Sequence, residues 1–583
     1  MTLDELARQM LEEMCDAMIG LQVRATGYEH LDGSLLCPAC LHLHGRASDA
    51  MEPLLQQARI SGRQEYADAA QALFCWLERT MSQPDGSWKN DIDSDWKGIS
   101  VFTCIMLENC LSCYGDLLRP DMRDSIDTRL RRAAGYLYEA SGSLVARNIN
   151  YPLSNALALF LLGKRFGEQR YLDESEALTE LAWRVVSPHG LLFGEGIPRD
   201  RHSPKGCCSI DLGYNMEETI PALVELAHAR QDARLWDLAA HLMERHLSFM
   251  LPDGGIDNSW GTRNYKWTWW GSRTTDGIVL SLGLLAQKDA RFLEPLKRHL
   301  GQLRRTMHSG LLFGGPDYQR AGEEACVHHT FTHAKGLARF VRLSLGRSAD
   351  LEEKLPEGYG RFVPEGTFHW SECDTFVEVK GNMRATVTAY DWTNMPDGHA
   401  SGGTLSLLYH HPHGPILAAG MCSYARKEKY NMQVPREIHR HVCATMRLQV
   451  GAFSSMYDTK ARMIRSSSGI FVQGTLCDAK GERASGCGYS FEYHLAEDAI
   501  EIKARLQEGM LILPLVADQI VCKEAHRLVL AYRGGMIEVT SHQELTLPYG
   551  REICFNLVPG FLLVPVAVAF SHETMVRIAV GRV

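Results

Sequence analysis

The sequence contains no apolar run that approaches the length of a membrane span, which excludes a protein that crosses the bilayer by helices. Basic residues are not in excess, since 61 Lys and Arg stand against 70 Asp and Glu and give a net charge of -9. A basic stripe of the kind that follows a nucleic-acid backbone is also absent. We therefore expect neither a membrane nor a nucleic acid as partner, and an acidic substrate would have to meet a local cluster of Arg, Lys and His.

The pattern of an export signal is also missing. Residues 1–14 (MTLDELARQMLEEM) predict an acidic amphipathic helix and not a basic start followed by an apolar core, although a trimmed sequence would look the same. The 17 cysteines are odd in number and irregularly spaced, which favours reduced thiols over a disulfide framework. We expect a cytoplasmic protein that degrades imported oligosaccharide fragments. The sequence leaves open whether the protein forms a homo-oligomer.

Helical patterns fill residues 1–355. Apolar residues recur at helical spacing in the segments 66–81, 127–139, 154–166, 172–186, 235–250, 275–287 and 292–307. Turn-rich connectors recur with Gly86, Gly190, Gly254 and Gly310, which lie roughly one or two lengths of a 50-residue helical hairpin apart. Stacked hairpins of this size form a solenoid or close into an α/α toroid, with similar loops on one face. In either arrangement we expect the loop face to carry the active site.

The remaining residues, 356–583, have a different pattern. Short runs that are β-branched or alternating, such as 376–379, 384–389, 403–409, 415–419, 446–450 and 469–474, are separated by Gly, Pro, Asn and Asp. Long helical signals disappear. We predict an antiparallel β-sandwich domain, joined to the toroid through the turn-rich residues 355–364.

Residues 195–226 place two candidate proton-transfer groups in a loop that enters a helix. His202 and Tyr214 follow a stretch rich in Gly, Pro and charge, and apolar residues at helical spacing begin after Asn215. Glu217 and Glu218 stand in the first turn, where carboxylates suit the helix dipole. A His and a Tyr held this way near arginines can transfer protons beside a bound anion, whereas the alternative is a polar connection whose tyrosine packs on the next helix.

Residues 253–276 combine tryptophans with cations in a glycine-bounded loop. The aromatic and basic residues there are Trp260, Arg263, Tyr265, Lys266, Trp267, Trp269, Trp270 and Arg273. Aromatic faces stack on pyranose rings while Arg and Lys meet carboxylates, so we favour a subsite for an acidic sugar. The alternative is an aromatic cluster that seals the toroid.

Three motifs carry a resemblance to a known family. They are RNINYPLSNALAL at 147–159, DLGYNMEETIPAL at 211–223 and PDGHASGGTLSLLYHHPHGPILAAG at 396–420. With the order of a helical part and a β-part, they resemble the heparinase II/III-like polysaccharide lyases and their chondroitin and alginate lyase relatives. The resemblance implies an α/α toroid joined to a β-sandwich and an enzyme that cleaves a uronic-acid-containing oligo- or polysaccharide by β-elimination.

The same resemblance implies roles for particular residues. Asn150 matches the asparagine that neutralises the uronate carboxylate, Tyr214 the tyrosine acid/base, and His399 a histidine contributed across the domain interface. Elimination removes a proton at C5 of the uronate, which is acidic only when the carboxylate is neutralised; Asn150 with Arg263 or Arg273 provides suitable donors. His202 is a further candidate base from its loop position alone.

The sequence leaves open whether the protein binds a structural zinc ion. Cys37 and Cys40 form one CxxC pair with His42 and His44 close behind, but a second half at matching spacing is missing from the local sequence. Folding would have to bring a further ligand, for which Cys207, Cys208 and Cys326 are the candidates. His328, His329 and His333 also cluster, and we favour hydrogen bonds inside the toroid for them.

Two other functions stay open from sequence alone. Glycoside hydrolases also use toroids, and residues 90–98 (NDIDSDWKG) supply Asp91, Asp93 and Asp95 as carboxylates beside a tryptophan, with further acidic residues elsewhere. A non-catalytic carbohydrate-binding protein would keep the aromatic loop and lack the acid/base set. Absorbance of a newly formed unsaturated uronate would distinguish a lyase from both.

Overall fold

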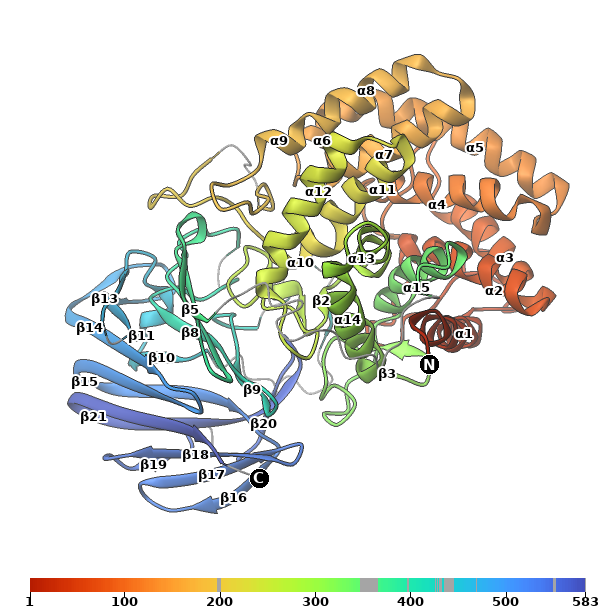
Figure 1. The fold of residues 1–583 in the computed structure, drawn as a ribbon. Helices are drawn as coiled ribbons and strands as arrows, with labels where there is room; N and C mark the ends of the chain where they lie inside the picture. Colours follow the sequence, from red (N-terminus) through yellow and green to blue (C-terminus); the bar gives the residue numbers. More distant parts are fainter. Residues whose placement is uncertain are drawn as a thin grey trace.

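The computed structural model describes residues 1–196, 201–346, 365–395, 398–424, 426, 428, 432–434, 445–467, 469–548 and 552–581. A helical part comes first and a strand-rich part follows, and the two lie side by side (Figure 1). The helices end with α15 (Val327–Arg342) and the strands of the second part begin with β5 (Gly366–Trp370). The domain boundary predicted at 355/356 lies in residues 347–364, outside the described residues.

The helical part is a closed double ring. Its inner helices are α2 (Met51–Ser61), α4 (Ile99–Tyr114), α7 (Asn150–Phe166), α11 (Ile220–Arg230), α13 (Val279–Ala286) and α15. Each of these helices packs against the next one, and α15 packs against α2, which closes the ring. Of the two arrangements predicted from the recurring hairpins, the α/α toroid is therefore confirmed.

An outer helix covers each inner helix. In the order of the inner ring, the outer partners are α3 (Gln64–Thr80), α5 (Pro120–Glu139), α8 (Gln169–Thr179), α12 (Ala233–His246), α14 (Leu293–Thr306) and α1 (Leu3–Leu21). The inner α13, VLSLGLLA, is apolar nearly all round, whereas the outer α14, LEPLKRHLGQLRRT, has one apolar and one charged face. This difference in pattern decides which layer each helix occupies, because only the outer layer has a face in water.

The glycine connectors are tight hairpin turns after outer helices. Gly86, Gly190, Gly254 and Gly310 have φ of 98°, 84°, 84° and 74°. Short antiparallel bridges flank them, for example Ser82 with Trp88 and Met250 with Ile256. Since left-handed backbone favours glycine, the recurring residue in the sequence marks a recurring turn in the fold.

Buried ion pairs connect the inner helices. Arg339 of α15 donates three charge-assisted hydrogen bonds to Glu52 of α2 at 2.7 to 3.0 Å and pairs with Glu225 of α11 at 2.7 Å. Lys335, one turn earlier in α15, lies 3.0 Å from Asp49 and 2.8 Å from Asp276. The contacts with Glu52 and Asp49 join segments that are nearly 290 residues apart in the chain.

The strand-rich part is an antiparallel sandwich, as predicted. A meander of β5, β6 (Thr375–Lys380), β7 (Met383–Thr388), β8 (Thr404–His410) and β9 (Gly414–Ala418) lies nearest the toroid. Two long strands, β15 (Ala499–Val516) and β21 (Phe561–Val580), pair along their length and anchor the remaining strands. The remaining strands in the blue part of Figure 1 include β10 (Arg447–Val450), β13 (Ile470–Cys477), β14 (Arg483–Leu495), β16 (Gln519–Lys523), β17 (Arg527–Tyr532) and β18 (Gly535–Ser541).

Aromatic residues from residues 253–276 fill the space between the two parts. Trp267 and Trp269 pack with Tyr409 of β8 and Phe561 of β21, and Trp260 packs with Tyr390. This loop delays the next inner helix: α13 begins at Val279, although the sequence pattern predicts a helix from 275. Among the described residues, none of the helices has both the length and the apolar composition needed to span a bilayer.

We expect substitution of Gly310 by alanine to destabilise the toroid strongly. A Cβ there would lie 2.1 Å from the carbonyl oxygen of Glu13 in α1, in addition to the cost of a positive φ. Gly62 is a matched control, since its φ is 72° and nothing lies within 4 Å of its Cβ position. Gly62→Ala should lower the unfolding free energy by about 1–2 kcal/mol, and Gly310→Ala by at least about 1–3 kcal/mol more. Thermal denaturation of both variants tests this, and equal melting temperatures would contradict it.

Candidate active site

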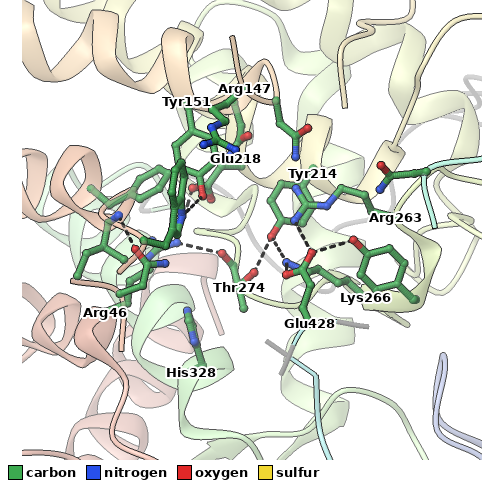
Figure 2. Close-up of a pocket in the computed structure, with 18 of the residues that line it drawn as sticks. Arg46, Arg147, Tyr151, Tyr214, Glu218, Arg263, Lys266, Thr274, His328 and Glu428 are labelled. Atoms are coloured by element: carbon green, nitrogen blue, oxygen red, sulfur yellow. Dashed lines mark hydrogen bonds and ion pairs between the residues drawn. The ribbon is translucent and has the colours of Figure 1, made fainter. Parts of the chain in front are cut away.

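A cavity of about 460 Å³ opens on the face of the toroid that meets the sandwich (Figure 2). Loops and short helices that lead into the inner helices, together with the first turns of α7 and α15, form most of its wall. They contribute Arg46, Asn90, Trp96, Arg147, Asn148, Asn150, Tyr151, Tyr214, Arg263, Tyr265, Lys266, Thr274 and His328. The sandwich part contributes Asn394, Met395 and Glu428. The predicted location of the site on a loop face of the toroid agrees with this cavity.

The architecture explains why so many functional groups meet here. Inner helices α4, α7, α11 and α15 begin close to cavity residues, so their N-terminal ends point toward the same space. Helix N-termini carry partial positive charge and unpaired N–H groups. The cavity is therefore suited to an anionic group even though the whole chain is acidic.

Tyr214 is held in place by local structure on both sides. The carboxylate of Asp211 caps the short helix α10 (Leu212–Tyr214) and accepts a hydrogen bond from the Tyr214 N–H at 3.0 Å. A π-helical turn, Asn215–Thr219, follows and leads into α11. Such wide turns inside helices occur frequently at functional sites, because they re-aim side chains without ending the helix.

The Tyr214 hydroxyl lies among polar groups inside the cavity. It is 2.6 Å from Thr274 Oγ1, and Lys266 Nζ donates a hydrogen bond to it at 2.9 Å (Figure 2). The Arg263 guanidinium stacks 3.7 Å above the centre of its ring. Burial raises the pKa of Tyr214, whereas the charge of Arg263 acts in the opposite direction. The resting tyrosine is therefore protonated, with two cations placed to stabilise a phenolate.

Glu428 reaches the cavity from the sandwich part and joins these cations. Its carboxylate lies 2.5 Å from Lys266 Nζ and 3.3 Å from Arg263, and it accepts a hydrogen bond from the Tyr265 hydroxyl at 2.8 Å. Burial, followed by the nearby charge of Arg263, lowers the pKa of Lys266 to about 8, although Glu428 opposes the shift. The amine is therefore mostly protonated at neutral pH and loses its proton slightly above it.

Asn150 and Glu195 form the neighbouring wall. The backbone N–H of Asn150 donates to Glu195 at 3.1 Å, and the other carboxylate oxygen of Glu195 lies 3.1 Å from Arg263. Burial raises the pKa of Glu195 to about 7, and the charge of Arg263 opposes the shift. The side-chain oxygen of Asn150 has no hydrogen-bond partner among the described residues, although it is buried. An unpaired amide oxygen in a cavity wall is a candidate contact for a ligand.

The opposite wall carries another set of polar groups. The backbone carbonyl of Thr274 accepts a hydrogen bond from Arg46 at 2.9 Å, so Thr274 links both walls. Arg46 is itself balanced by carboxylates, including Asp49 at 2.8 Å and Glu218 at 3.7 Å. Neither ring nitrogen of His328 has a partner among the described residues. These groups offer further donors to a substrate.

Arg147 differs from the other arginines of the cavity because it is exposed. Its guanidinium stacks on the ring of Trp96 at 4.7 Å, and among the described residues it forms no ion pair. An exposed, unbalanced cation on an aromatic surface at the cavity edge fits an anionic group of an extended ligand.

The predicted site residues divide into two groups. The structure brings Asn150, Tyr214, Arg263, Tyr265 and Lys266 together in the cavity wall. The roles given to them stay predictions.

His202 and His399 lie outside the cavity lining. His202 is exposed and lies 3.7 Å from the thiol of Cys208. Both ring nitrogens of His399 face backbone carbonyls, those of Trp392 and Ala400, and its ring stacks on Tyr390. With both nitrogens occupied by the protein, His399 is placed as a packing residue near the cavity and not as a group that lines it.

The prediction that the tryptophans form a stacking surface for a sugar is wrong. Trp260, Trp267 and Trp270 have exposed fractions of 0%, so they offer no ring face to a sugar. Arg273 is also buried and bonds the Tyr318 hydroxyl away from the cavity. The alternative interpretation, an aromatic cluster that seals the toroid, describes these residues.

The acidic cluster predicted for a hydrolase is not in the cavity lining. Asp91 is buried against His42 and His44 at 3.4 and 3.3 Å. Asp95 is fully exposed and pairs with Lys89 at 3.2 Å. The histidines of α15 were expected to form hydrogen bonds inside the toroid, and His333 agrees, since it lies 3.4 Å from Glu217. For His328 this interpretation is wrong, because it lines the cavity and neither ring nitrogen has a partner among the described residues.

Sequence reasoning missed Arg46, Arg147 and Glu428 as cavity residues. It named Glu218 as a first-turn carboxylate and assigned His328 to the interior of the toroid, whereas both line the cavity. Arg147 lies three residues before Asn150, at the start of the motif at 147–159, so the sequence contained a signal for it. Glu428 belongs to a stretch without regular patterning, and only the docking of the sandwich on the toroid brings it to Lys266.

Comparison with known proteins gives a consistent result. The model of the ulvan lyase N-terminal domain matches residues 11–356, and the model of the ulvan lyase C-terminal domain matches residues 368–581. A broad-specificity ulvan lyase from Formosa agariphila is 32% identical over 596 aligned positions, which cover 97% of this chain and 92% of that protein.

Solved structures show the same architecture. A chondroitin AC lyase from Streptomyces coelicolor A3, in complex with chondroitin sulphate, superposes with a TM-score of 0.53 at 9% sequence identity. The match covers 100% of this chain and 80% of the other. At this identity the likeness concerns the fold alone, and it supports the architecture of a toroid joined to a sandwich.

We expect Arg263 and Arg273 to respond differently to alanine substitution. Arg263→Ala removes the cation above Tyr214 and should lower turnover about a hundredfold, the scale for a lost electrostatic donor. Arg273→Ala should lower the melting temperature and leave the turnover of the folded fraction near the parent value, because Arg273 does not line the cavity. Steady-state kinetics with circular dichroism on each variant make the comparison. Equal losses of turnover in two folded variants would contradict this division.

Proposed function

Because the chain belongs to the ulvan lyase family and is a polysaccharide lyase, we propose that the cavity between toroid and sandwich cleaves ulvan by β-elimination beside a uronate, with Tyr214 as the proton-transferring residue. Family membership removes the hydrolase and the non-catalytic alternatives. The observation that carries the proposal for this site is the Tyr214 hydroxyl, held in the cavity 2.9 Å from Lys266 Nζ and 2.6 Å from Thr274 Oγ1.

The reaction needs a withdrawn proton and a protonated leaving group. In β-elimination the C5–H and C4–O bonds of the uronate break, a C4=C5 double bond forms, and the leaving glycosidic oxygen gains a proton. The C5 proton becomes acidic when the carboxylate is neutralised. The Asn150 amide and the cationic face of Arg263 are the groups proposed to do this, since both line the cavity.

Tyr214 can serve both proton transfers in this scheme. Tyr214 rests as the phenol, and the reactive form is the minor phenolate that remains after its proton is lost to solvent. This phenolate would take the C5 proton while the Lys266 ammonium and the Arg263 guanidinium stabilise its charge. The phenol formed in this way then donates a proton to the leaving oxygen. His202 and His399 have no part in this proposal because neither lines the cavity.

The size of the preferred substrate is a separate proposal. The expected cytoplasmic location favours oligosaccharides over long polymers. Viscosity of a high-molecular-mass ulvan solution tests this: slow viscosity loss with steady release of small unsaturated products supports an oligosaccharide enzyme, and a rapid drop in viscosity contradicts it.

We expect Tyr214→Phe to remove most of the activity on ulvan. The substitution deletes one oxygen and keeps the ring under Arg263, so folding should persist while turnover falls by about two or more orders of magnitude. Absorbance of the unsaturated uronate measures turnover, with chondroitin sulphate as a comparison substrate. Tyr318→Phe is the matched control, because Tyr318 is an equally buried tyrosine outside the cavity.

Two results distinguish a failure of the proposed substrate from a failure of the proposed role of Tyr214. Parent protein that forms unsaturated product from chondroitin sulphate and none from ulvan would refute the substrate. A folded Tyr214→Phe protein that cleaves at the parent rate would refute the assignment of Tyr214 and leave the lyase activity intact.

We also expect kcat/KM to stop rising with pH above about 8. Because Tyr214 rests protonated, its phenolate fraction grows as the pH rises, and below about pH 8 the Lys266 ammonium is present to stabilise this phenolate. Above about pH 8 the ammonium is lost, which offsets the gain in phenolate. Lys266→Met should lower turnover below pH 8 and remove this levelling, whereas Lys97→Met, a surface control, should preserve it. A parent activity that keeps rising through pH 8 without a change of slope would contradict the role of the Lys266 ammonium.

A further inference from the structure

Four potential metal ligands from distant parts of the chain meet behind the cavity wall. Cys37, Cys40 and His44 lie in the loop before the 3-10 helix Gly45–Ala50, and Cys326 is the N-cap residue of α15. The Cys37 and Cys326 sulfurs are 3.7 Å apart, and the Cys40 sulfur is 3.2 Å from His44 Nε2. One ligand atom each of Cys37, His44 and Cys326 lies within 4.8 Å of the others.

These separations fit a tetrahedral zinc site. With Zn–S bonds of about 2.3 Å and Zn–N bonds of about 2.0–2.1 Å, the edges of the tetrahedron measure about 3.8 Å between sulfurs and about 3.6 Å between sulfur and nitrogen. The observed 3.7 Å between the sulfurs of Cys37 and Cys326 matches the first value, and the observed 3.2 Å between Cys40 and His44 is about 0.4 Å shorter than the second. A disulfide would need sulfurs about 2.05 Å apart.

The surroundings of His44 also match those of a metal ligand. Its Nε2 faces the cysteines, and its Nδ1 lies 3.3 Å from a carboxylate oxygen of Asp91. A carboxylate on the second ring nitrogen fixes the tautomer that presents the other nitrogen to a metal. Cys37 and His44 are buried, with exposed fractions of 0% and 2%. A set of three cysteines and one histidine leaves no open position, which is typical of structural sites and not of catalytic ones.

We propose that Cys37, Cys40, His44 and Cys326 bind one structural Zn²⁺, with Asp91 orienting His44. The ion connects the loop after α1 to the start of α15, two segments that are 289 residues apart at Cys37 and Cys326. Arg46 follows His44 by two residues and His328 follows Cys326 by two, and both line the cavity. The metal therefore fixes one wall of the active site from behind without entering the chemistry.

Metal content of the full chain tests the proposal directly. Protein purified without chelators should contain one zinc per chain by inductively coupled plasma mass spectrometry. X-ray absorption at the zinc edge should give three sulfur neighbours at about 2.3 Å and one nitrogen neighbour at about 2.0–2.1 Å. Both measurements use the parent protein, so they do not depend on the folding of a variant.

Substitutions locate the ion. Cys40→Ser changes a half-buried loop residue and should lower the zinc content several-fold, as should Cys326→Ser. Cys75→Ser is the matched control, since Cys75 is half-buried and outside the cluster, and it should keep one zinc. Asp91→Asn should weaken zinc binding by about 10–100-fold in a chelator competition, because the outer carboxylate is lost.

Three results would overturn the site. They are a folded parent protein that stays free of zinc after incubation with zinc salt, an absorption spectrum without sulfur neighbours, and full zinc content in Cys40→Ser and Cys326→Ser. The second result would favour His42, His44 and Asp91, which also lie within ligand spacing of one another.

Discussion

Closure of the helical ring is the constraint on which the rest of the structure depends. The last inner helix, α15, must pack against the first, α2. Two cations of α15, Arg339 and Lys335, form the buried ion pairs that fix its position. Their partners are Glu52, Asp49, Glu225 and Asp276. Buried charges are costly unless each is paired and hydrogen-bonded, so a misplaced α15 would leave several of them uncompensated. Closure in the correct register also places Cys326 beside Cys37 and His328 in the cavity wall.

The closed ring explains how an acidic protein presents a local cationic surface. The inner helices direct their N-terminal ends to one face, and the loops on that face carry Arg46, Arg147, Arg263 and Lys266. Most of these cations are balanced by buried carboxylates, which keeps them ordered, whereas Arg147 is exposed at the edge. The net charge of -9 is therefore compatible with a local cationic surface.

The two domains form the site jointly. Glu428 of the sandwich holds Lys266 and Arg263 of the toroid, and these cations set the environment of the Tyr214 hydroxyl. The tryptophans of residues 253–276 bury their rings between the domains, and this packing fixes the loop that carries Arg263 and Lys266. The same loop thus supplies both the aromatic packing and two cations of the cavity wall, with its tryptophans facing inward and Arg263 and Lys266 facing the cavity.

Local sequence patterns were sufficient for the order and type of the two domains. Helical periodicity and repeated turn glycines predicted stacked helical hairpins, and later alternation predicted a sandwich, because each pattern reflects which face of an element is buried. Arg263, Tyr265 and Lys266 stood out because they lie in a loop of unusual composition. Tyr214 stood out from its loop and from the family resemblance, and Asn150 from the resemblance alone. The tertiary structure alone decided which way side chains face and which distant segments meet. In the folded protein Trp260, Trp267 and Trp270 are buried, and His202 and His399 lie outside the cavity lining. Folding also places Glu428 beside Lys266 and Cys326 beside Cys37. The physical reason is that burial and long-range contact depend on ring closure and domain docking, which no short window of sequence contains.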